Sequence, residues 1–136
     1  MLTAHKVQDD IIALLADSEL VRALSGKVYR EGYRPRDSRK EDVVVIFVTG
    51  TPTQVERGAV TLNIYIPDIT PYKNGVYDAD GRRIAEVEAL ADAWVESLKA
   101  SRSNYKFTLL RTISTMREEA INQHFVAVQL EYTYKG

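Results

Sequence analysis

The sequence predicts a single α+β domain over residues 1–136, with an antiparallel or mixed sheet of four to five strands and two amphipathic helices packed on it. Three observations predict this class. Two neighbouring apolar runs have the character of paired strands, and apolar residues recur at helical spacing in two other segments. A chain of 136 residues is also long enough to form one hydrophobic core. The expected element order is α-β-β-β-α-β-β.

The predicted centre of the sheet is a pair of strands. Residues 43–48 form an unbroken β-branched and aromatic run without charge, which is typical of a strand covered on both faces. Residues 59–67 alternate instead, and their inward face is predicted to consist of Val60, Leu62, Ile64 and Ile66. We expect the two runs to pair antiparallel across a polar loop at residues 49–57, because Gly50 and Pro52 indicate a loop and not a continued ladder.

The first predicted helix lies near the N-terminus, where apolar residues recur at Val7, Ile11, Leu14, Leu15 and Val21. Asp17 and Ser18 could break it into two pieces, because both side chains compete for backbone hydrogen bonds. Gly26 is a plausible stop, and residues 27–30 are predicted to form a short edge strand.

The second predicted helix covers residues 82–100, with Asp80 as its cap and Trp94 in the core. Its apolar stripe is made of Ile84, Val87, Ala91, Trp94 and Leu98. On the polar side three carboxylates stand four residues apart, at Glu88, Asp92 and Glu96, with Lys99 near the last of them. Because the row is expected on an open helix face, it is interpreted as a solvated face or an acidic surface for a basic partner.

Two further strands are expected after this helix. Residues 105–109 alternate between apolar and polar and could continue as a strand to Ser114. Residues 116–121 are interpreted as a charged connector, and the last strand is predicted at residues 124–134.

Two loops supply the candidate interaction residues. Residues 31–42 are predicted to be exposed, and they carry Arg34, Arg36, Arg39 and Lys40 among four acidic side chains that cancel most of the positive field. One hypothesis for this loop is a small nucleic-acid- or protein-binding module, and another is contact with the acidic row of a neighbouring subunit. Residues 67–81 form a long loop in which Tyr72 and Tyr77 add amphipathic surface of the kind enriched at interfaces, whereas its Asp78–Gly81 motif only weakly resembles a calcium loop.

Composition argues against several function classes. The net charge of -1 is a poor match for a general binder of nucleic acid or anionic membranes. There is no Cys, and His5 and His124 are the only histidines, so we expect no structural metal and no cofactor. No nucleotide-binding or catalytic motif is present, which makes a small-molecule enzyme the least favoured hypothesis. No membrane span or signal peptide is recognised, and the protein is expected to be intracellular.

In this order of elements the chain resembles the tail-terminator and head–tail joining (tail completion) proteins of long-tailed bacteriophages. The resemblance rests on five stretches: GKVY at residues 26–29, DVVVI at 42–46, RGAVTLNIYIPD at 57–68, GRRI at 81–84 and HFVAV at 124–128.

The resemblance implies a structural virion protein that is not an enzyme and has no catalytic residues. Such a protein closes into a ring, commonly of six copies, at the head-proximal end of the tail tube. Its implied partners are other copies of itself, the tail tube and the head connector, with no membrane and no specific nucleic acid. Its implied location is the host cytoplasm during assembly and then the virion tail.

Overall fold

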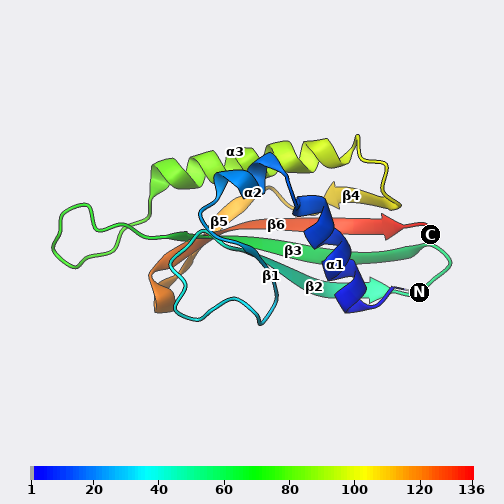
Figure 1. Cartoon of the computed structure of the whole chain (residues 1–136), viewed down its shortest axis with the longest axis horizontal. Helices are drawn as coiled ribbons and strands as arrows, with labels where there is room; N and C mark the ends of the chain where they lie inside the picture. The colour runs from blue at the N-terminus through cyan, green and yellow to red at the C-terminus, as the bar shows by residue number, and fades with distance from the viewer. Residues whose placement is uncertain (1) are drawn as a thin grey trace.

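The alternating strands build a mixed sheet that is covered by helices on one face (Figure 1). This computed structural model describes residues 2–136. The strands are β1 Val28–Arg30, β2 Val43–Thr51, β3 Glu56–Pro67, β4 Tyr105–Leu109, β5 Ser114–Glu118 and β6 Gln123–Tyr134. The sheet order is β1-β2-β3-β6-β4, with β5 also paired to β6. Only β1–β2 is parallel among these pairs, so the predicted α+β class with a mixed sheet is confirmed.

The core lies between the helices and the two longest strands. In the antiparallel register of β3 and β6, Leu62 faces Val128 and Ile64 faces Val126, and all four side chains are fully buried. Because successive strand residues point to opposite faces, this register places the apolar halves of both strands on the same side of the sheet. The predicted inward face of residues 59–67 is therefore confirmed.

Three helices cover that apolar face: α1 Ala4–Leu15, α2 Glu19–Ala23 and α3 Gly81–Leu98. The predicted break in the first helix is confirmed, since Asp17 takes a left-handed φ of 61° and the Ser18 side chain caps α2. Trp94 of α3 is 5% exposed and belongs to the core, as predicted. Within residues 2–136, no helix combines the length and the apolar character needed to cross a membrane.

The predicted loop at residues 49–57 is wrong, because the β2–β3 ladder continues to the pair Thr51–Arg57 after a bulge near Phe47. The two glycines of this stretch, Gly50 and Gly58, lie opposite each other in the ladder. A Cβ on Gly58 would stand 2.5 Å from the Tyr132 hydroxyl and 2.3 Å from the Thr49 carbonyl oxygen. The glycines therefore make room for a tyrosine of β6 and do not form the turn, which is confined to residues 52–55.

The C-terminal half also differs from the prediction. The sheet has six strands, and residues 114–118 form β5 where the sequence indicated mainly a connector. β4 and β5 lie one after the other along the same edge of β6, because Leu109 pairs with Leu130 and Ser114 with Ala127. Leu109 and Ser114 are five positions apart in the chain, whereas their partners on β6 are three positions apart. The two extra residues interrupt the edge strand.

Candidate functional site

A narrow arm projects from one end of the molecule between β3 and α3 (Figure 1). We define the arm as residues 69–78. Two backbone hydrogen bonds close its stem, from the Ile69 N–H to the Asp78 oxygen (2.9 Å) and from the Asp78 N–H to the Ile69 oxygen (2.8 Å). Gly75 has a φ of +77°, a conformation that glycine adopts without strain, and it turns the chain near the tip.

The arm concentrates exposed apolar surface. Of the nine large hydrophobic side chains that are exposed in residues 2–136, four lie in this ten-residue segment: Ile69, Tyr72, Val76 and Tyr77. Tyr72 is 78% exposed and Val76 is 54% exposed. A contiguous group of this kind on a projecting segment is typical of a contact surface for another protein.

The loop of residues 31–42, which we call the brace loop, packs against the base of the arm. The sequence predicted that it is exposed throughout, and this is wrong for three of its charged residues, Arg34, Glu41 and Asp42. The Glu41 side chain is 13% exposed. The Arg34 side chain is 10% exposed and the Asp42 side chain is 1% exposed. The two side chains form an ion pair with each other.

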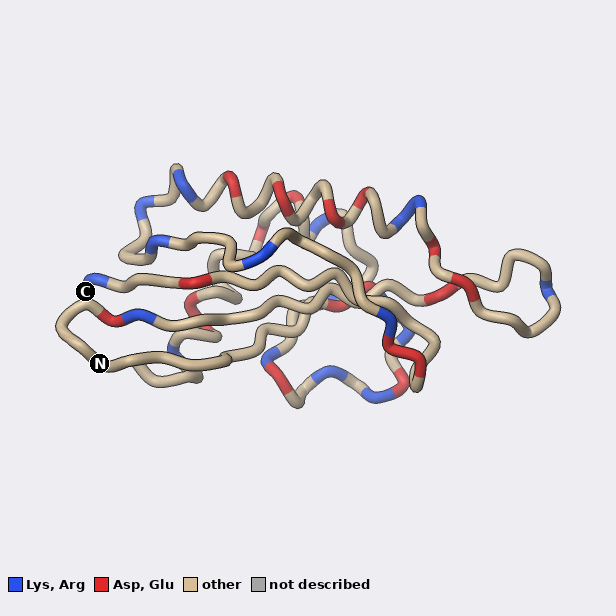
Figure 2. Tube along the Cα trace, turned by 180° about the vertical axis from the view of Figure 1, so that it is seen from behind, with Lys and Arg blue, Asp and Glu red and all other residues tan. Residues whose placement is uncertain are grey.

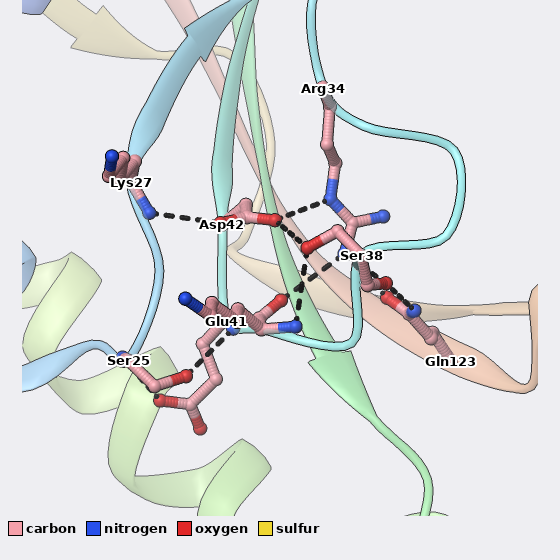
Figure 3. Close-up of polar contacts among 8 residues, drawn as sticks. Ser25, Lys27, Arg34, Ser38, Glu41, Asp42 and Gln123 are labelled. Atoms are coloured by element: carbon pink, nitrogen blue, oxygen red, sulfur yellow. Dashed lines mark hydrogen bonds and ion pairs between the residues drawn. The ribbon is translucent and has the colours of Figure 1, made fainter.

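The Asp42 carboxylate accepts three hydrogen bonds (Figure 3). The donors are the Lys27 N–H at 2.9 Å, Arg34 Nε at 2.9 Å and the Ser38 hydroxyl at 2.5 Å. Burial alone would raise the pKa of this carboxyl, but the three donors and the Arg34 charge outweigh it, and the pKa is lowered. Gly26 permits the close approach, since a Cβ there would lie 2.0 Å from Asp42 Oδ1.

Arg34 joins the brace loop to the sheet. One of its terminal nitrogens donates to Gln123 Oε1 at 2.8 Å, and the guanidinium carbon lies 4.1 Å from the centroid of the Tyr65 ring. Gln123 is 1% exposed and returns a hydrogen bond from Nε2 to the Ser38 oxygen at 2.7 Å (Figure 3). The Arg34 side chain therefore fastens the loop to β3 and β6.

Side-chain contacts of Asp68 and Arg39 lie at the base of the arm. Asp68, just before the stem, is hydrogen-bonded to His124, with Asp68 Oδ1 2.6 Å from His124 Nδ1. Arg39 donates to the Ile121 oxygen at 3.1 Å, and its guanidinium lies 5.7 Å from the centroid of the Tyr77 ring. Sequence reasoning missed the Asp68–His124 pair because 56 residues separate its members, and only the β3–β6 register brings them together.

The second end of the arm is held by a bidentate ion pair. Arg83, in the first turn of α3, donates from Nε to Glu41 Oε2 at 2.6 Å and from its terminal nitrogen to Glu41 Oε1 at 2.9 Å. The hydrogen bonds from Arg83 lower the pKa of Glu41 despite partial burial. Asp80 caps α3 by accepting from the Arg83 N–H at 3.2 Å, as predicted. The brace loop thus contacts the chain on both sides of the arm.

The acidic row divides into three environments. Glu88 accepts a hydrogen bond from the Thr115 hydroxyl at 2.7 Å, Glu96 pairs with Lys99 at 3.0 Å, and Asp92 is exposed. The row lies along α3, and in the view of Figure 2 the strands run between α3 and most of the brace loop. Contact between these two charged surfaces in neighbouring copies stays a prediction. The exposed basic residues of the brace loop are Arg36, Arg39 and Lys40, and Arg39 already donates to the Ile121 oxygen.

The acidic residues of the arm region do not form a cation site. Within residues 2–136, no three His, Asp or Glu side chains are grouped as metal ligands would be. Asp68 is engaged by His124, and Asp80 is engaged as a helix cap. The charged side chains at the base of the arm pair with one another, and these pairs fix the position of the arm.

Comparison with known proteins adds no relative. No protein-family model matches the chain, and no curated protein is significantly similar to it in sequence. The geometry of the arm and of the brace loop is therefore the principal basis for a functional proposal.

Proposed function

We propose that this chain is a structural virion protein of a long-tailed bacteriophage, a tail-terminator or head–tail joining protein that forms a ring at the head-proximal end of the tail tube. The observation that carries the proposal is the projecting arm with its exposed Tyr72, Val76 and Tyr77. The order of elements quoted above for the phage family supports the same reading.

The arm is suited to binding because it is held before any partner arrives. Ordering a flexible segment on association costs about 0.5–1.5 kcal/mol for each immobilised side chain, and a segment that is already fixed avoids part of this cost. Two backbone hydrogen bonds between Ile69 and Asp78 close the stem, and the Asp68–His124 and Arg83–Glu41 pairs hold the chain on either side of it. Tyrosine adds large contact area with few rotatable bonds, which further limits the entropy lost.

A ring requires contacts between different surfaces of neighbouring copies. Such heterologous contacts close into a ring when the rotation between copies divides a full turn, and they otherwise give an open helix. A molecule with an arm at one end of its long axis has two chemically distinct ends, which suits this kind of assembly (Figure 1).

The proposal implies a protein that acts by binding and needs neither a cofactor nor catalytic residues. Its partners are other copies of itself, in a ring of about six, together with the tail-tube and head-connector proteins. It is located in the host cytoplasm during assembly and afterwards in the virion tail.

The test is deletion of the coding sequence from the phage or prophage that carries it, followed by electron microscopy of the particles. We expect filled heads and separate tails, with joined particles restored when the wild-type chain is supplied in trans. An antibody against the chain should label restored particles at the junction of head and tail. Normal virions in the deletion strain, or label at any other place, would refute the proposal.

A further inference from the structure

The tip of the arm carries a dipeptide with a reactive backbone. Asn74 is followed by Gly75, and both residues are exposed. The chain has three other asparagines, and they precede Ile64, Tyr105 and Gln123. A side chain on the residue after an asparagine hinders attack by that residue's backbone nitrogen on the asparagine carboxamide. Asn74 is therefore the asparagine of this chain whose carboxamide has an unhindered nitrogen next to it.

The structure leaves the dipeptide open and directs the side chain towards its own backbone. Among residues 2–136, apart from the two chain neighbours, no heavy atom stands within 4 Å of the place that a Cβ on Gly75 would take. Asn74 Oδ1 accepts a hydrogen bond from the Val76 N–H at 3.1 Å. A bond to the backbone two residues on folds the carboxamide back over the intervening peptide group. The same donor stabilises negative charge that develops on Oδ1 during attack at Cγ.

We propose that Asn74 is a site of spontaneous deamidation. The Gly75 nitrogen attacks Asn74 Cγ and loses its proton to water, and the new C–N bond closes a succinimide ring. The carboxamide nitrogen takes up a proton and leaves as ammonia. Water then opens the ring: breaking the bond between Cγ and nitrogen gives aspartate, and breaking the bond between the former backbone carbon and nitrogen gives isoaspartate. Water is the only co-reactant, and nothing is oxidised or reduced.

Either product changes the exposed surface of the arm. The charges of Lys73 and Asp78 balance within residues 69–78, so a new carboxylate leaves the arm negatively charged. Isoaspartate also lengthens the main chain at the tip by one methylene group. Tyr72 and Val76 are exposed on either side of the dipeptide, so both changes fall within the apolar surface of the arm. The inference needs only the exposed arm and does not depend on the proposed function.

The chain offers a matched position where the fold should oppose the same reaction. Asp80 Oδ1 accepts from the Arg83 N–H at 3.2 Å, and Gly81 is the first residue of α3. This bond directs the side chain to the helix N-terminus, three residues on, and the helical backbone is fixed. Asn caps helices about as well as Asp. Asp80→Asn therefore creates a second Asn–Gly dipeptide while keeping the cap.

The test follows the full-length wild type, Asn74→Gln and Asp80→Asn during incubation at neutral pH. Isoaspartate is measured with an isoaspartate methyltransferase, and both products are located by mass spectrometry of peptides. Circular dichroism verifies that each variant is folded. The same proteins are incubated in urea, which removes the influence of the fold.

We expect aspartate and isoaspartate to accumulate at Asn74 of the wild type, and the isoaspartate to be lost in Asn74→Gln. Misplacing reacting groups by about 1 Å can cost about a hundredfold in rate, so position 80 of folded Asp80→Asn should react about tenfold or more slowly than Asn74. In urea the two positions should react at similar rates.

Three results would overturn the inference. Deamidation at Asn74 of the folded wild type that is no faster than at Asn104 or Asn122 would show that the site is not reactive. Undiminished isoaspartate in Asn74→Gln would place the reaction elsewhere. Equal rates at Asn74 and at position 80 of folded Asp80→Asn would show that the conformation of the arm does not promote the reaction.

Discussion

Replacing Arg34 with methionine tests whether the brace loop is held by its buried ion pair. Methionine keeps much of the length and apolar volume of the side chain but removes the guanidinium, which contacts Asp42, Gln123 and the ring of Tyr65. Leaving one member of a buried ion pair without its partner typically costs about 3–5 kcal/mol. Because Asp42 keeps the donors from Ser38 and Lys27, we expect a loss near the lower end, about 3 kcal/mol of unfolding free energy.

The control is Arg36→Met, two positions along the same loop. Arg36 is exposed, and substitutions at such positions usually change stability by less than about 0.5 kcal/mol. The assay is urea unfolding followed by circular dichroism, with the slope m compared to verify that the two variants unfold in the same way. Equal small effects at Arg34 and Arg36 would show that Arg34 is an ordinary surface residue and that the brace loop is not anchored as described.

Three further results are expected. Trp94→Ala should cost about 3–5 kcal/mol in urea unfolding because it leaves a cavity under α3, while Asp92→Ala on the exposed face should cost less than about 0.5 kcal/mol; equal costs would mean that the helix packs through another face. The pKa of Asp42 is lowered in the folded state, so its contribution to stability is complete above its unfolded pKa of about 3.9 and is lost as the pH falls through the lower folded value. Asp42→Asn should therefore flatten the acid limb of stability against pH, and a limb parallel to that of the wild type would contradict this. The wild type is expected to bind duplex DNA only weakly, and changing Arg36 and Lys40 to Glu should leave that affinity unchanged. If the wild type instead bound DNA strongly and in a salt-sensitive way, and the variant lost this binding, a nucleic-acid-binding module would be favoured.

The sequence predicted those parts of the fold in which one local pattern decides the outcome. The alternation around Leu62 and Ile64 and the helical stripe around Trp94 each have a single way to bury their apolar side, and the structure buries them in that way. Gly50 was misread because a glycine that opens a turn and a glycine that admits a tyrosine from another strand look alike in sequence.

The candidate site could be predicted only in part. The exposed Tyr72 and Tyr77 stand in a segment that composition alone identifies as a long loop. Arg34 and Arg36 have the same local surroundings in sequence, and only the folded loop buries the first and exposes the second. The pocket lined by Val55, Tyr105 and Thr133 could not be foreseen, since these residues meet only through the sheet order.

The measurement that tests the central claim most directly is the mass of the purified wild-type protein as a function of concentration, by native mass spectrometry and multi-angle light scattering. A closed ring has no unpaired end, so we predict one discrete oligomer, of about six copies, whose mass stays constant once it has formed, with a ring in negative-stain images. A monomer at every concentration, or a mean mass that keeps rising with concentration as in an open fibre, would contradict the account.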